Sequence, residues 1–159
     1  MNDKEFYNAI PGLLHKVFDQ TIMFKIPGDP RGKERPRRAK HGGMYTPSET
    51  IAYEKKVKAC FLEAVSGCGD IQPTEGPVAL RIVSKLSIPK AATKKMLDGI
   101  AKGEIFPTKK PDIDNIEKIV MDALEGLAYK NDSQVVFMLH GKHYSETPGV
   151  EVWVERIGK

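Results

Sequence analysis

Three carboxylates and one lysine surround a short amphipathic segment in the second half of the chain. Asp112 and Asp114 are separated by one residue, Lys118 follows one helical turn later, and Asp132 comes after the segment ends. Mg²⁺ binds carboxylate oxygens, keeps several waters and takes its other ligands from substrate phosphates. A lysine near a scissile phosphate stabilises the charge of the transition state or orients the attacking water. The group therefore suits a site that holds Mg²⁺ against a phosphate, with Lys118 placed to act on that phosphate.

The same segment also allows a purely structural interpretation. Asp112 can be the N-cap of the helix that follows, and Asp114 and Lys118 can form an i, i+4 ion pair on its surface. Three features favour chemistry: a pair of lysines precedes the acids, Asp132 is delivered just before a predicted strand, and Asn115 adds an amide oxygen beside the acids. Both interpretations stay open on the sequence alone.

A cluster of cations lies upstream of the acidic segment. Residues 31–40, RGKERPRRAK, carry six cations and one acid, a local charge of +5 in a chain of net charge +4. Because like charges this close repel unless an anion binds them, the cluster favours nucleic acid as a partner. Residues 31–45 are expected to form a mobile basic loop or a loose hairpin that turns at Gly42-Gly43. The residues expected to hold DNA phosphates are Arg31, Lys33, Arg35, Arg37, Arg38, Lys40, Lys109, Lys110 and Lys142.

Length and composition exclude several classes of protein. The 159 residues, 40% of them apolar, fit a single domain over 1–159 with a hydrophobic core. No apolar run reaches the roughly 20 residues of a membrane helix, and the N-terminus lacks a secretory signal, so a cytoplasmic protein without membrane contacts is expected. Cys60 and Cys68 predict reduced thiols. His140 and His143 face opposite sides of a predicted strand, which argues against a zinc site.

The apolar pattern predicts an α+β fold with a small, mostly antiparallel sheet and helices packed on one face. Thr46 to Glu49 form a predicted capping box. The last two strands are expected to pair as a hairpin, and Trp153 falls on the face opposite the valines of its strand. Helices are predicted at residues 3–18, 46–65, 90–101 and 114–127, and strands at residues 21–26, 78–86, 135–140 and 150–155.

The length of the helix in the acidic segment separates the predicted site residues. A helix from Asp114 to Leu127 is about 20 Å long, so Asp132 follows its far end. An antiparallel two-fold pairing would bring Asp132 of one subunit next to the acids of the other. The sequence therefore predicts a homodimer with two composite sites. A bent connection that returns Asp132 to the start of its own helix is the alternative.

At these residues the chain resembles the RusA family of Holliday junction resolvases, small endonucleases often carried by phages and prophages. The resemblance rests on Asp112, Asp114, Asn115 and Lys118, followed by NDSQV at residues 131–135. It is sharp over residues 111–156, where KHYSETPGVEVWV also matches. In the N-terminal half it rests on IPGDPRGKERPR and on the YTP before the next helix.

The resemblance implies a homodimer that cuts four-way DNA junctions with Mg²⁺, or with Mn²⁺ as a substitute. It implies Asp112, Asp114 and Asp132 as metal-binding acids and Lys118 as the catalytic lysine. One departure is Asn131, which stands where the family usually has an acid; the amide keeps an oxygen but loses a charge. The leading interpretation is thus a resolvase acting in recombination or repair. A junction-binding protein without catalysis is the alternative, and a small-molecule phosphatase leaves the basic loop unexplained.

Overall fold

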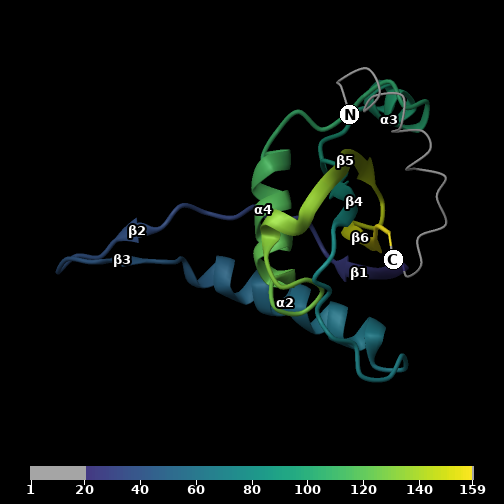
Figure 1. Ribbon diagram of the computed structural model, residues 1–159. Helices are drawn as coiled ribbons and strands as arrows, with labels where there is room; N and C mark the ends of the chain where they lie inside the picture. Colours follow the sequence, from purple (N-terminus) through teal and green to yellow (C-terminus); the bar gives the residue numbers. More distant parts are fainter. Residues whose placement is uncertain (1–20, 159) are drawn as a thin grey trace, which may run out of the picture.

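The computed structural model describes residues 21–158, so the helix predicted at residues 3–18 lies outside the described part. The described chain has an α+β fold (Figure 1). Its elements are β1 (Thr21–Pro27), β2 (Arg37–Arg38), β3 (Met44–Tyr45), α2 (Ser48–Val65), β4 (Val78–Ser87), α3 (Lys94–Ala101), α4 (Ile113–Leu124), a 3₁₀ helix η1 (Asp132–Gln134), β5 (Val135–Ser145) and β6 (Gly149–Arg156).

The main sheet has the strand order β1-β6-β4-β5. β6 is antiparallel to both β1 and β4, whereas β5 runs parallel to β4. The predicted hairpin of the last two strands is therefore wrong, because β4 lies between them. Alternation identifies a strand but not its neighbour in the sheet. Side chains on both faces of β4 are buried, as at Ala79 and Leu80, so β4 is a central strand. The buried backbone N–H and C=O groups of β4 therefore need a hydrogen-bonding strand on each edge. β5 is left at the edge of the sheet and continues past the predicted end to Ser145.

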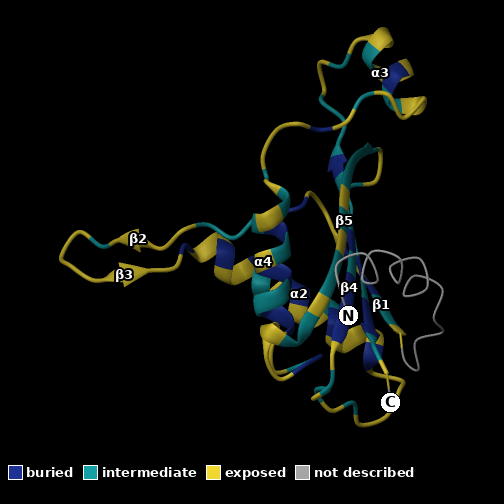
Figure 2. Ribbon diagram, turned by 45° about the horizontal axis from the view of Figure 1, so that its top comes forward, coloured by how far each residue is buried: buried dark blue, intermediate teal, exposed yellow. Residues whose placement is uncertain are grey.

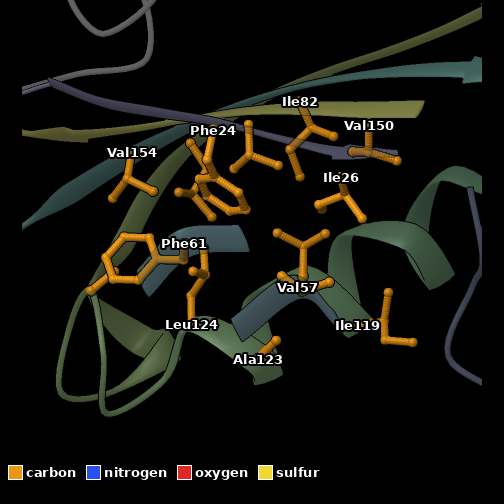
Figure 3. Packing of buried hydrophobic residues seen from close by; sticks show 14 of the residues in the cluster. Phe24, Ile26, Val57, Phe61, Ile82, Ile119, Ala123, Leu124, Val150 and Val154 are labelled. Atoms are coloured by element: carbon orange, nitrogen blue, oxygen red, sulfur yellow. The ribbon is translucent and has the colours of Figure 1, made fainter. Parts of the chain in front are cut away.

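α2 and α4 pack against each other on one face of this sheet. Figure 3 shows Val57 and Phe61 of α2 and Ile119 of α4 pointing at the sheet residues, among them Phe24 and Ile82. The rings of Phe24 and Phe61 meet edge to face with centroids 5.7 Å apart. The apolar stripe of α4 is buried as predicted, and burial of this stripe sets the rotation of the helix. That buried stripe is Ile116, Ile119, Val120, Ala123 and Leu124.

Three local expectations need correction. α2 begins at Ser48 with Pro47 as its N-cap and no side-chain capping bond, so the predicted capping box is wrong. Proline has no backbone N–H, so one donor fewer needs a partner at the start of this helix. The first turn is closed by a backbone bond, in which the amide of Thr50 donates to the carbonyl of Pro47. α4 ends at Leu124, three residues early, because Gly126 turns the chain with φ of +77°. On the far face, Trp153 packs under the Arg81 guanidinium at 5.2 Å.

β2 and β3 form an arm that projects from the body (Figure 2). The two strands pair as a hairpin with Arg37 opposite Tyr45, and the amide of Ala39 donates to the carbonyl of Gly43 at 3.0 Å. Every strand residue of the arm is exposed. Such a hairpin gains little from burial, so its surface is available to a partner. Among residues 21–158, none of the helices combines the length and the apolar character needed to cross a bilayer.

Candidate functional site

The acids Asp112 and Asp114 stand at the start of α4 with exposed side chains. Asp112 is the N-cap residue, but its carboxylate makes no capping hydrogen bond, and Asp114 lies in the first turn. Neither acid, nor the exposed Lys118, takes part in an ion pair within the described part of the chain. Asp112 therefore occupies the predicted N-cap position without a capping bond, the predicted ion pair of Asp114 with Lys118 is not formed, and both carboxylates remain available beside the positive end of a helix.

The site acids face a broad hollow of about 890 Å³. One wall is segment 30–37, and the other is the entry to α4; the lining there includes Lys110, Pro111, Asp112, Asp114 and Asn115. Gly32 holds the two walls together, because its backbone passes so close to Asn115 that no side chain fits between them. The amide of Lys33 also donates to the carbonyl of Asn115 at 2.8 Å. The cationic segment is therefore fastened to the helix that carries the acids.

Two of the predicted phosphate ligands are directed into the protein. The ammonium of Lys33 donates to Glu54 of α2 at 3.1 Å and to Asp122 of α4. Partial burial disfavours its charge, but these two carboxylates prevail and raise the pKa of Lys33. The ammonium of Lys142 donates to the carbonyls of Lys109 and Pro111. Both lysines join structural elements in this conformation.

The other predicted cations are more open. Arg31 pairs with Glu49, and Arg37 pairs with Glu34 at 2.5 Å, all at exposed positions where such pairs contribute little. Lys109 lies 5.9 Å from the ring centre of Tyr144. Within residues 21–158, the exposed cations without an ion pair include Arg35, Arg38, Lys40 and Lys110. DNA binding by these residues stays a prediction.

A second group of acids lies at the opposite end of α4. One carboxylate oxygen from each of Asp122, Glu125 and Asp132 falls within 4.8 Å of the others. These are oxygen donors only, which fits a hard divalent cation. Sequence reasoning missed Asp122 and Glu125 as neighbours of Asp132. The signal was the continuation of the Asp114 and Lys118 face by one more turn to Asp122, followed by the turn at Gly126.

Asp132 is held by a small capping motif. The side chain of Asn131 accepts from the amide of Ser133 at 3.0 Å, and the side chain of Gln134 accepts from the amide of Asn131 at 2.8 Å. Gln134 also donates to the carbonyls of Thr74 and Gly76, both at 2.9 Å. Asn131 therefore has a local structural role. Asn and Asp are comparable N-caps, so the amide fills this role as well as the acid implied by the resemblance would.

The predicted metal ligands do not meet within one chain. α4 has 12 residues and is about 18 Å long. Asp112 and Asp114 stand at its start, whereas Asp132, which follows the helix, lies beside Asp122 in the last turn of α4. The bent connection that would return Asp132 to its own helix start is therefore wrong.

The sequence profile described as Endodeoxyribonuclease RusA matches residues 27–155. This chain belongs to the RusA family. The resemblance seen in the acidic segment is thereby confirmed, and it extends over the basic segment and over β4, β5 and nearly all of β6, whereas β1 lies almost entirely before the matched residues. RusA proteins form a family of endonucleases that resolve Holliday junctions. The chain is also similar to "Uncharacterized protein YqaN" of Bacillus subtilis (strain 168), with 36% identity over 141 residues, covering 86% of this chain and 96% of the relative.

Proposed function

We propose that this RusA-family chain is a Mg²⁺-dependent endodeoxyribonuclease that resolves four-way DNA junctions in recombination or repair, acting as a homodimer. The observation that carries the proposal is the free carboxylate pair Asp112 and Asp114, which borders a hollow whose other wall is cationic. Cations such as Arg35 and Lys110 attract the DNA backbone to this hollow, where the acids would otherwise repel it. The same hollow thus offers phosphate binding and metal binding side by side.

The roles of the residues follow from their positions. Asp112 and Asp114 supply hard oxygen ligands from one helix start, which leaves the other ligand positions to water and to a phosphate oxygen. Asp112 and Asp114 would hold Mg²⁺, or Mn²⁺ as the expected substitute, and the ion would supply Lewis acidity to a water and to the phosphate. Lys118 is one turn along α4 and exposed, and its ammonium stabilises the transition state or orients the attacking water.

Asp132 completes each site from the partner subunit in this proposal. β5 supports that arrangement because it is an edge strand, begins just after Asp132 and passes Pro111 at Lys142. If two copies of β5 pair antiparallel about a two-fold axis, the start of one strand lies beside the end of the other. Asp132 of the partner subunit then approaches the acids at the start of α4. Two such sites on one particle match the symmetry of a four-way junction.

A labelled immobile four-way junction tests the catalytic proposal. The wild type should nick it with Mg²⁺ or Mn²⁺ and not with EDTA, and Asp114→Asn should bind the junction but not cut it. Binding without any metal-dependent cutting by the wild type would identify a non-catalytic junction binder. Hydrolysis of a free nucleotide phosphate with no action on DNA would identify a phosphatase. Either result rejects the proposed function.

Subunit mixing tests the composite site separately. Asp114→Asn and Asp132→Asn homodimers should each be inactive. In a mixed dimer with composite sites, both substitutions fall in one site and the other site is intact, so mixing should restore up to about a quarter of the wild-type sites. Sites built within single chains would leave the mixture inactive. A monomer with full activity would reject the dimer and leave the nuclease assignment standing.

A further inference from the structure

β5 turns alternate side chains toward α4, and two of them are polar. In the register with β4, His140 lies beside Ile82 and Lys142 beside Ser84, so both side chains share the face that carries the helices. Apart from Ser84, the buried β4 residues on this face are apolar, among them Leu80 and Ile82. Polar groups placed there need partners, because an unpaired buried polar group is costly. Both residues find their partners in segment 109–117.

Lys142 binds the backbone that leads into the acids. Its ammonium donates to the carbonyl of Lys109 at 2.8 Å and to the carbonyl of Pro111 at 3.1 Å. Pro111 immediately precedes Asp112, so this bond fixes the peptide next to the first acid. A cationic donor to a carbonyl is stronger than a neutral one. The contact leaves one of the three ammonium hydrogens for other partners.

His140 binds α4 on the other side of the acids. Its imidazole is 1% exposed, with Nδ1 3.2 Å from Glu117 Oε1 and Nε2 2.8 Å from Ser84 Oγ. An ionised Glu117 only accepts hydrogen bonds, so Nδ1 carries the proton, and Nε2 accepts from the Ser84 hydroxyl. Burial lowers the pKa of His140 to about 4, which keeps this ring neutral at pH 7. Glu117 is three residues from Asp114 and is therefore on the same side of α4.

The order serine, histidine, acid resembles a hydrolytic triad, but its position excludes that chemistry. Ser84 is completely buried, at 0% exposure. A nucleophile must reach its substrate, and no path to Ser84 opens from the hollow, whose lining does not include it. The three groups satisfy one another and connect β4, β5 and α4. Their arrangement is that of a structural hydrogen-bond network.

We infer that Lys142 and His140 are positioning residues that clamp segment 109–117 from β5, one on each side of Asp112 and Asp114. Lys142 holds the backbone before the acids, and His140 holds α4 after them, at Glu117. The clamp fixes both carboxylates relative to the sheet without touching a substrate. Lys142 then acts inside the protein and is not a phosphate ligand, which replaces the role predicted from its charge. The catalytic consequence rests on the proposed function, whereas the clamp itself does not.

Hydrogen exchange on the free wild-type protein and on Lys142→Met tests the clamp without any activity. Methionine keeps the length of the side chain and removes the ammonium. We expect amides 116–118, near the start of α4, to exchange about tenfold faster, while amides of α2 are unchanged. His140→Gln, which keeps a donor and an acceptor, should give a smaller increase than His140→Phe, and it remains informative if the phenylalanine variant does not fold. Unchanged exchange at residues 116–118 in both Lys142→Met and His140→Gln overturns the inference.

Salt dependence of junction binding separates a positioning lysine from a phosphate ligand. Lys110→Met is the matched control, because Lys110 lines the hollow and is exposed. Loss of a phosphate contact lowers the slope of log K against log salt by about one, and we expect this for Lys110→Met only. A slope lowered equally in Lys142→Met would assign Lys142 to DNA and overturn the inference.

If the wild type nicks the junction, the metal requirement provides a further readout. Lys142→Met should raise the Mg²⁺ concentration for half-maximal nicking about tenfold, since residues that orient metal ligands affect metal affinity to this extent. KM for the junction should not change. A wild type that fails to nick rejects the proposed function but leaves the exchange and salt experiments valid.

Discussion

Gly32 is where the basic segment touches the candidate active site, and Gly32→Ala tests that contact. A Cβ at this position would lie 2.8 Å from the Cβ of Asn115 and 3.3 Å from the Cβ of Pro111. The Cβ of Asn115 is bonded directly to the backbone of α4, so no change of rotamer relieves the overlap. The two backbones must therefore separate.

The size of the effect follows from this geometry. Carbon atoms pack at about 3.5–4.0 Å, so the walls must part by roughly 0.7–1.2 Å near Asn115. That displacement stretches the bond from the Lys33 amide to the Asn115 carbonyl, now 2.8 Å long. Overpacking of this kind costs about 1–3 kcal/mol, and we expect the free energy of unfolding to fall by about 2 kcal/mol. The rate of junction nicking should fall as well, because segment 30–37 moves away from Asp112 and Asp114.

Urea unfolding and nicking of a four-way junction measure the two effects on the same preparations. Gly67→Ala is the control, because no atom lies within 4 Å of its added Cβ and its φ is not positive. The control should be neutral or slightly stabilising. If Gly32→Ala matches the control in both assays, the close contact does not exist in solution. If stability falls and nicking does not, the contact holds the fold but does not position the site.

Three further predictions concern charged groups. Lys33→Met should lower the free energy of unfolding by about 1–2 kcal/mol, because it leaves Asp122 and a second half-buried carboxylate without their cation, and should leave the salt slope of DNA binding unchanged. The double variant Arg38→Met/Lys40→Met should lower that slope by about two without loss of stability, and an unchanged slope would remove the arm from the DNA interface. Burial lowers the pKa of His140 to about 4 from 6.5, so as the pH falls the imidazole of the unfolded chain takes up a proton at a higher pH than that of the folded chain. The contribution of the neutral His140 to the free energy of unfolding is complete above about pH 6.5. It is lost as the pH falls toward 4, by on the order of 3 kcal/mol. Urea titrations from pH 7 to 4.5 should show a steeper loss in wild type than in His140→Gln.

Local patterns explain why much of the fold was predictable. The apolar residues of α4 recur at helical spacing, and burial of that stripe places Asp114 and Lys118 on the exposed side, as their spacing indicated. The alternation in β6 likewise placed Val150 and Val154 in the core. These features depend on neighbours a few residues apart in the chain. The pairing of strands does not, and the same alternation allowed a β5–β6 hairpin that the insertion of β4 replaces.

The partners of the cationic side chains were the least predictable part of the site. Lys33 and Lys110 are equally cationic in the sequence, but one points at Asp122, 89 residues away, and the other remains exposed at the hollow. The grouping of Asp122 and Asp132 depends on the turn at Gly126, which reverses the chain just after α4. A longer helix would have placed Asp132 farther from Asp122.

By itself the sequence determined the RusA family, and the spacing of the acids, the lysine and the cationic segment carried the resemblance that predicted it. It also determined that one helix separates Asp114 from Asp132, because the rise per residue of an α-helix is fixed. Only the tertiary structure decided which charges are free. Contacts between residues far apart in the chain direct Lys33 and Lys142 inward and leave Asp112 and Asp114 open, since a side chain's partner depends on which elements pack beside it.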